Sequence, residues 1–149
     1  MMRKILLLVL FTLAASTCAY NEKYPATVRQ PEITSWETLT PQALNLKIQQ
    51  ARRAGKAWPA KPERVIFHLF DLSDLKSVDY QYRTDKIEAP TQIKIQLIRD
   101  GFLDDAVRGD IHQLKLNRQA GGDWKITSLK KTTRCWRFNP AVYASTPCP

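Results

Sequence analysis

The sequence predicts an α+β fold in which two N-terminal helices pack on a curved, roughly four-stranded antiparallel sheet. Apolar residues recur at helical spacing between residues 40 and 55, and alternation of apolar and polar residues begins at Val78. Pairs such as Asp100-Gly101 separate the alternating stretches as turns would. Two cysteines near the C-terminus predict a tail held by a disulfide.

Residues 1–19 have the layout of a secretory signal peptide. Arg3 and Lys4 supply positive charge, residues 5–15 are apolar apart from one threonine, and small residues follow. The apolar run is shorter than the roughly 20 residues that a membrane-spanning helix needs. We therefore expect export, with the mature protein periplasmic or secreted.

The fate of Cys18 distinguishes two forms of the exported protein. Cleavage after Ala19 removes Cys18 and leaves a soluble protein, which is the interpretation we favour. Cleavage after Ser16 is an alternative that would leave Cys18 in the mature chain. Lipidation of Cys18 would instead tether the chain as an outer-membrane lipoprotein, although residues 15–17 match a bacterial lipobox only in part. Membrane contact is expected only if Cys18 is lipidated.

The remaining chain has the size of one domain. We expect residues 20–38 to form an extended lead-in and residues 39–149 to form a single α+β domain. Without the signal peptide the chain keeps 21 basic and 14 acidic residues, a net charge of +7. Such a charge attracts anionic surfaces, but a solvated charged surface is the simpler interpretation.

The first helix is predicted to begin at Thr40-Pro41. Thr40 suits the N-cap and Pro41 the first helical position, and Gly55 can end the helix.

A short second helix is predicted from Pro62. Arg64, His68 and Asp71 would form one polar stripe on it, and the helix should stop near residues 73–74. A buried strand is the alternative for this segment.

Four antiparallel strands are predicted around residues 78–83, 93–97, 107–119 and 123–136. In the third, Val107 and Ile111 share one phase of the alternation and Leu114 and Leu116 the other. This slip indicates a β-bulge near His112-Gln113. A second slip occurs at Leu129.

Cys135 and Cys148 are predicted to form a structural disulfide that closes the loop 135–148. An oxidising compartment and an even number of cysteines after signal removal favour this pairing. A zinc site needs about four ligands, and two distant histidines do not supply the rest. We expect no metal and no cofactor.

The order of elements resembles the NTF2-like and cystatin-like α+β folds. The ending is also similar to that of small exported proteins of Gram-negative bacteria: a "GDWKI" hairpin strand, an "RCW" strand end and a loop closing at "PC". Proteins with NTF2-like folds include enzymes and binding modules, so the resemblance alone does not choose a function.

No catalytic residue can be nominated. His68 with Asp71, or His112, could transfer protons in a small NTF2-like enzyme, but a surface stripe and a solvent-exposed strand histidine are the simpler interpretations. Asp100, with Asp110 and the carboxylates between them, lacks calcium-loop spacing and indicates an acidic surface loop.

The candidate anion-binding residues are Lys130, Arg134, Trp136 and Arg137, in which cations interleave with an aromatic ring. A charged edge strand is the simpler interpretation. The expected function is that of an envelope or periplasmic binding or structural module, with an anionic envelope component or a protein as partner. Nucleic acid is not an expected partner.

Overall fold

The computed structural model describes residues 31–137, 139 and 141–149 of the 149-residue chain. The predicted signal peptide 1–19, the lipidation candidate Cys18 and most of the lead-in lie outside these residues.

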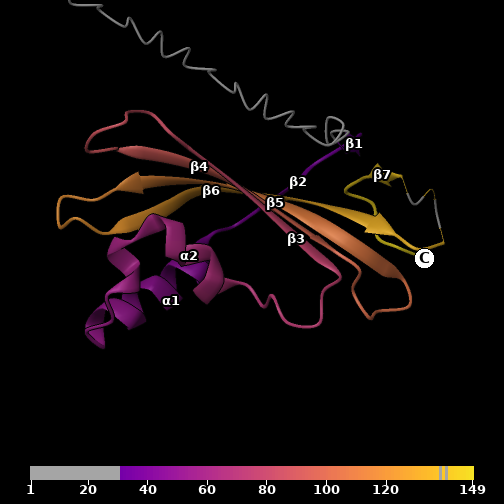
Figure 1. Ribbon diagram of the computed structural model, residues 1–149, viewed down its shortest axis with the longest axis horizontal. Coiled ribbons are helices and arrows are strands. Elements are labelled where there is room, and N and C mark those ends of the chain that lie inside the picture. The colour runs from indigo at the N-terminus through magenta and orange to yellow at the C-terminus, as the bar shows by residue number, and fades with distance from the viewer. Residues whose placement is uncertain (1–30, 138, 140) are drawn as a thin grey trace, which may run out of the picture.

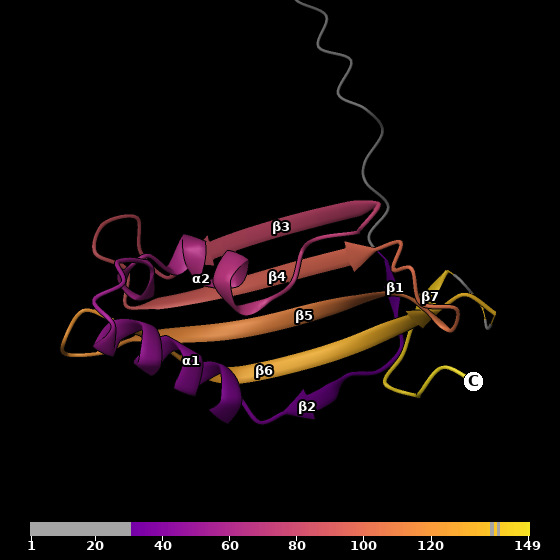
Figure 2. The ribbon, with the colours of Figure 1, turned by 90° about the horizontal axis from the view of Figure 1, so that it is seen from below.

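The described residues form an α+β fold with helices on one face of a five-stranded antiparallel sheet (Figures 1 and 2). The sheet order is β2-β6-β5-β4-β3, and a separate pair joins β1 to β7. The strands are β1 (Glu32–Ile33), β2 (Glu37–Leu39), β3 (Ser77–Thr84), β4 (Gln92–Asp100), β5 (Val107–Arg118), β6 (Trp124–Cys135) and β7 (Val142–Tyr143). The helices are α1 (Gln42–Arg53), a 3₁₀ turn η1 (Trp58–Ala60) and α2 (Pro62–Leu69). The predicted meander is β3 to β6, and the end of the lead-in adds β2 as a fifth strand.

The α1 helix matches the prediction except at its start. Pro41, not Thr40, occupies the N-cap position, and no side chain caps the helix. Thr40 directly follows the last residue of β2, so the chain is still leaving the sheet at that point. Gly55 ends the helix as predicted: its φ of +68° suits a residue without a side chain, and its N–H donates to the carbonyl of Arg52 at 2.9 Å.

Asn45 fastens α1 to the sheet. Its amide nitrogen donates to the carbonyl of Ile126 at 2.9 Å, and its amide oxygen accepts from the Ile126 N–H at 2.9 Å. Strand β2 pairs only with residues 129–131 of β6. The Asn45 side chain therefore makes the hydrogen bonds with Ile126 that a neighbouring strand would otherwise make, because Ile126 lies beyond the end of β2.

The α2 helix exists as predicted but is shorter than expected. It ends at Leu69, four residues before the expected stop near residue 73, and Phe70 is already extended. Val65, Ile66 and Leu69 are buried against the sheet. The predicted stripe therefore does not continue on the helix as far as Asp71.

The prediction of a bulge near His112-Gln113 is wrong. The pairing of β5 with both neighbours runs through these residues without interruption. The alternation changes phase because one part of β5 is buried on the helix side of the sheet and another part is buried on the opposite side. Leu114 and Leu116 face the helices, whereas Ile111 is fully buried on the opposite face.

The second slip, at Leu129, does mark a bulge. Leu116 pairs with Ile126 and Lys115 pairs with Ser128, which leaves Thr127 of β6 as an extra residue. The extra residue keeps Ile126 and Leu129 in the same core.

The C-terminal disulfide between Cys135 and Cys148 is formed, as predicted. Within the closed loop, β7 pairs in parallel with β1, and Ala144 forms an antiparallel bridge with Thr133 of β6. Tyr143 of β7 is buried, and the guanidinium of Arg134 lies 5.0 Å from its ring centre. The tail thus covers one end of the sheet face that the helices leave bare (Figure 1).

Replacing both cysteines, in C135S/C148S, should lower the free energy of unfolding by about 3 kcal/mol, the chain-entropy value for a loop of this size. Urea unfolding followed by tryptophan fluorescence measures the change. Reducing agent should lower the wild-type midpoint and leave the double variant unchanged. A double variant as stable as the wild type would contradict a structural role for the bond.

Candidate functional site

A groove of about 480 Å³ runs along the sheet face opposite the helices, which we call the open face. Side chains from four neighbouring strands line it. They are Gln81, Arg83, Lys94, Gln96, Gln113, Lys115, Ser128 and Lys130. Ile95 and Leu114 also border the groove, but their side chains belong to the core on the helix side. None of these described lining residues is acidic.

Strand register places the basic residues side by side. Arg83 of β3 is directly opposite Lys94 of β4, and Lys94 is directly opposite Lys115 of β5. Side chains of directly opposed residues lie about 4.5–5.5 Å apart at Cβ. These three residues, the cationic row, therefore form a line of positive charge across three strands.

A second row of amides runs parallel to the first. Gln81, Gln96 and Gln113 are directly opposed on the same three strands, and Lys130 of β6 continues the line. The amide nitrogen of Gln113 donates to the amide oxygen of Gln96 at 3.0 Å. This amide row offers donors and acceptors beside the positive charge.

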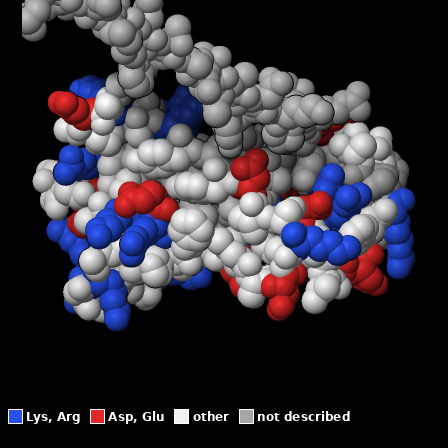
Figure 3. All heavy atoms as spheres, in the orientation of Figure 1, with Lys and Arg blue, Asp and Glu red and all other residues white. Residues whose placement is uncertain are grey.

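The cations of the groove have no acidic partner among the described residues. Arg83, Lys94, Lys115 and Lys130 take part in none of the ion pairs found there. Elsewhere the charges are mixed, and the face in Figure 3 shows basic and acidic side chains close together. The groove therefore differs from the face in Figure 3, because its described lining residues include basic but no acidic side chains.

At the other end of the open face, the basic residues are neutralised. Asp100 pairs with Arg134, and Nε of Arg108 lies 3.4 Å from the same carboxylate oxygen. Partial burial raises the pKa of Asp100, but the two guanidinium groups outweigh it and hold that pKa below its ordinary value. This end of the face is covered by Tyr143 and is not available to a ligand in the same way.

The structure does not bring the four candidate anion-binding residues together. Lys130 lines the groove, whereas Arg134 is bound to Asp100. The ring of Trp136 has Arg108 5.1 Å and Lys76 5.5 Å from its centre, and Arg137 is exposed beyond the strand. Only Lys130 therefore belongs to the groove described above.

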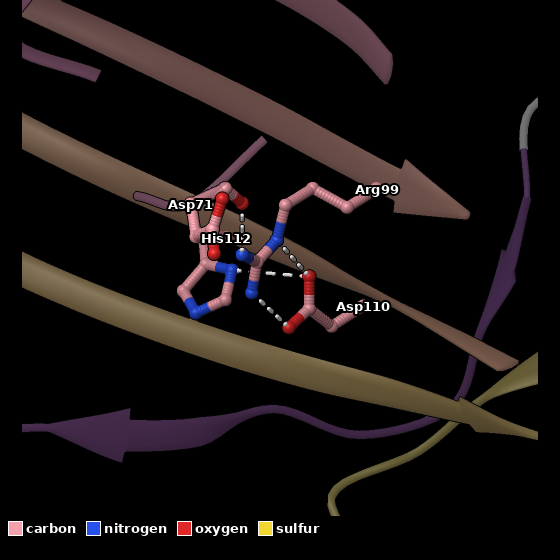
Figure 4. A network of polar contacts seen from close by, with 4 residues as sticks. All are labelled: Asp71, Arg99, Asp110 and His112. Carbon is pink, nitrogen blue, oxygen red and sulfur yellow. Dashed lines mark hydrogen bonds and ion pairs between the residues drawn. The ribbon is translucent and has the colours of Figure 1, made fainter. Parts of the chain in front are cut away.

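A buried polar network lies on the helix side of the sheet. Arg99 of β4 donates from Nε and Nη2 to the two carboxylate oxygens of Asp110 on β5, at 2.9 and 2.7 Å (Figure 4). Nη1 of Arg99 donates to the backbone carbonyl of Asp71 at 2.9 Å. The guanidinium lies 5.5 and 5.0 Å from the ring centres of Phe70 and Phe102. The network ties the segment after α2 to the sheet.

The predictions for His112 and Asp110 are wrong. His112 is 5% exposed rather than solvent-exposed, and its ring lies 4.7 Å from that of Phe70. Asp110 is 3% exposed and does not belong to an acidic surface loop. Both residues point to the helix side because they fall on the same phase as Leu114 and Leu116, and on that side Phe70 packs on His112.

The network has the geometry of a structural tie. Nδ1 of His112 lies 3.4 Å from the nearer oxygen of Asp110, and no hydrogen-bond partner for this nitrogen is found among the described residues. Neither His112 nor His68 is among the residues lining the groove. A proton-transfer role would need a substrate to reach a side chain that Phe70 covers.

His68 and Asp71 do not form the pair that their spacing suggested. His68 is exposed and stacks on Trp58 at 4.8 Å between ring centres. The Asp71 carboxylate accepts from the hydroxyl of Ser73 at 2.6 Å and from its backbone N–H at 2.9 Å. These hydrogen bonds lower the pKa of Asp71. They shape the turn after α2.

Comparison of the chain with protein-family models, curated proteins and solved structures finds no match in any of the three. Within the described ranges, no group of three or more His, Cys, Asp or Glu side chains could hold a metal ion. No helix in the described part of the chain is both long and apolar enough to cross a membrane. The groove and the buried network are therefore interpreted from their own geometry.

Replacing Asp110 with Asn should lower the free energy of unfolding by about 3–5 kcal/mol, because Arg99 would lose its buried counter-charge. Burial raises the pKa of Asp110, but His112 and Arg99 outweigh this and hold the pKa below its ordinary value. The contribution of Asp110 is therefore complete above about pH 4 and is lost as the pH falls through the lowered folded-state pKa. Urea unfolding of wild type and D110N between acid and neutral pH measures it.

Asp105, which is exposed, provides the control. D105N should change stability by less than about 0.5 kcal/mol at any of these pH values. A D110N deficit below about 1 kcal/mol, or one that does not shrink in acid, would contradict the account of the network.

Proposed function

We propose that the protein is an exported binding module that holds an acidic polysaccharide in the open-face groove. The single observation that carries the proposal is the cationic row: Arg83, Lys94 and Lys115 lie side by side and have no acidic partner among the described residues. Lys130 adds a fourth positive charge at the end of the amide row.

The cationic row carries an energetic cost in the absence of a ligand. Like charges directly opposed on neighbouring strands destabilise a sheet, by up to about 1 kcal/mol for each pair. Two such pairs occur here, Arg83 with Lys94 and Lys94 with Lys115. A bound anion would remove the repulsion and replace it with charge-assisted hydrogen bonds.

The chemistry of the groove favours a carbohydrate over other polyanions. Amide side chains can both donate to and accept from hydroxyl groups, and Gln81, Gln96 and Gln113 line up beside the charges. No aromatic side chain is among the described lining residues, so bases would have no stacking surface. The described groove also presents no apolar side chain that could enter a lipid layer. Carboxylates on a hydroxyl-rich chain match both rows.

The exported location is part of the proposal. The disulfide is the kind of bond that persists in an oxidising compartment such as the periplasm. Tethering through Cys18 would place the same groove at the outer membrane and would not alter its chemistry.

We also propose that the α+β fold is of the NTF2-like or cystatin-like kind. This likeness is supported by two helices packed on one face of an antiparallel sheet. The binding function rests on the groove itself and does not depend on this likeness.

Removing the two central charges, in K94Q/K115Q, should weaken binding of polygalacturonate by about tenfold or more. A hydrogen bond to a charged group contributes about 1.5–3 kcal/mol, and 1.4 kcal/mol corresponds to a factor of ten. Fluorescence titration with labelled polygalacturonate, at fixed salt, measures the affinity. The variant should be at least as stable as the wild type, because the repulsion within the row is removed.

Lys47 and Lys56, exposed residues on and just after α1, supply the matched control. The variant K47Q/K56Q loses the same net charge away from the groove and should bind within about twofold of the wild type. Neutral dextran should bind neither protein measurably. Equal weakening by both double variants would show that net charge alone governs binding and would overturn the proposed site.

A further inference from the structure

Strand β3 forms a long edge of the sheet. All eight of its residues pair with β4, and within the described part of the chain no strand lies on its other side (Figure 2). The opposite edge is different, because the three-residue β2 covers part of β6. An exposed edge presents a row of unpaired backbone N–H and C=O groups, which can pair with another strand.

Apolar side chains accumulate along this edge on the helix side. Phe67, Val78 and Tyr82 are 56%, 41% and 38% exposed. Phe67 and Tyr82 both contact Tyr80, with ring centres 5.7 and 6.5 Å apart. Three of the six exposed large hydrophobic residues of the described chain therefore gather at one edge. Such clustering marks an interaction surface more strongly than scattered exposure does.

Two charged residues of β3 favour a second copy of the same chain as the partner. Asp79 and Arg83 lie on the open-face side of the strand, and neither takes part in an ion pair among the described residues. They are equally spaced on either side of Gln81. A two-fold axis through Gln81 would therefore place Asp79 of one copy opposite Arg83 of the other, twice.

We propose that the protein forms a two-fold symmetric dimer in which β3 pairs antiparallel with β3 of a second copy, with Gln81 opposite Gln81. In this register Tyr80 faces Tyr82 of the other copy, which buries the aromatic cluster across the axis. Moving the two-fold axis by one residue in either direction loses this match. An axis through Tyr82 would set Asp79 opposite Asp85 of the other copy. An axis through Tyr80 would set Asp79 opposite Gln81 of the other copy. The charges thus oppose the alternative registers and favour one.

The dimer has a consequence for the open face. A two-fold axis perpendicular to the sheet keeps the open faces of both copies on the same side, within one ten-stranded sheet. Gln81 opposite Gln81 would join the two amide rows into one line that ends in Lys130 at each end. In the dimer Arg83 is opposite Asp79 of the other copy, so Lys94, Lys115 and Lys130 remain as the cations without an acidic partner in each groove. The inference goes beyond the proposed function and does not rest on it, because the edge, the aromatic cluster and the charge spacing are independent of any ligand.

Charge reversal combined with analytical ultracentrifugation tests the dimer. The disulfide-bonded wild type, without ligand, should show a concentration-dependent monomer–dimer equilibrium. D79R sets two arginines opposite each other at both ends of the interface, and R83D does the same with aspartates. Each single variant should raise the dimer dissociation constant by at least about tenfold. The double variant D79R/R83D restores opposite charges and should return the constant to within about threefold of the wild type.

A cysteine at the axis tests the register. In Q81C the two introduced cysteines would lie directly opposite, with Cα atoms about 4.5–5.5 Å apart, within the range that a disulfide spans. The control R83C would hold its two cysteines about 14 Å apart at roughly 3.4 Å per residue. Mild oxidation should cross-link Q81C and not R83C.

Three results would overturn the inference. They are a wild type that remains monomeric at all concentrations, a double variant that stays as weak as the single ones, and cross-linking of R83C in preference to Q81C. Circular dichroism of each variant confirms that the sheet is retained, so a loss of dimer cannot be attributed to unfolding.

Discussion

The pairing of β5 with both β4 and β6 is the constraint on which the rest of this structure depends. β5 is in register with β4 from Gly109 to Asn117 and with β6 along nearly its whole length. Because side chains alternate between faces, this double ladder decides which residues share a face and a row. The cationic row, the amide row and the Arg99–Asp110 ion pair are all cross-strand neighbours fixed by it.

The two faces of the sheet differ in the side chains that they carry and in what covers them. Towards the helices, apolar residues from β4, β5 and β6 form the core, and Arg99 with Asp110 closes its end beneath Phe70 and Phe102. On the open face, the disulfide-held tail covers one end, and the groove occupies the part that the tail leaves bare. Opposite charges meet where the sheet is covered, and positive charges stand without acidic partners in the described groove. This contrast between a neutralised end and a charged end is the physical argument for a binding surface.

Much of the fold could be predicted from local patterns. The α1 helix, its end at Gly55, the alternating strands and the Cys135–Cys148 bond each depend on residues close in sequence or on cysteine number. The phase slip in β5 was visible, but its cause was not local. Ile111 is fully buried on the face opposite the helices, so the correct explanation required knowing that the sheet buries residues on both of its faces.

The candidate site required information that one strand does not contain. Lys94 and Gln96 alternate with core residues in the sequence, and Lys115 with Gln113 does the same, yet nothing local sets one pair beside the other. The interleaved cations and tryptophan after Lys130 gave the stronger sequence signal. The fold separates them because Arg134 pairs with Asp100 of β4, a residue far from it in the sequence. The cationic row and the amide row would have been found if the strand register had been predicted first and the charges of directly opposed residues had then been compared.

The central claim is that an acidic carbohydrate occupies the groove between the two rows. Titration of the ¹⁵N-labelled protein with an oligomer of galacturonic acid, followed by NMR, tests it most directly. We predict saturable shifts in the side-chain amides of Gln81, Gln96 and Gln113 and in the backbone amides of Lys94 and Lys115. Shifts confined to the surface around Trp136 and Arg137, with the glutamine amides unmoved, would contradict the account.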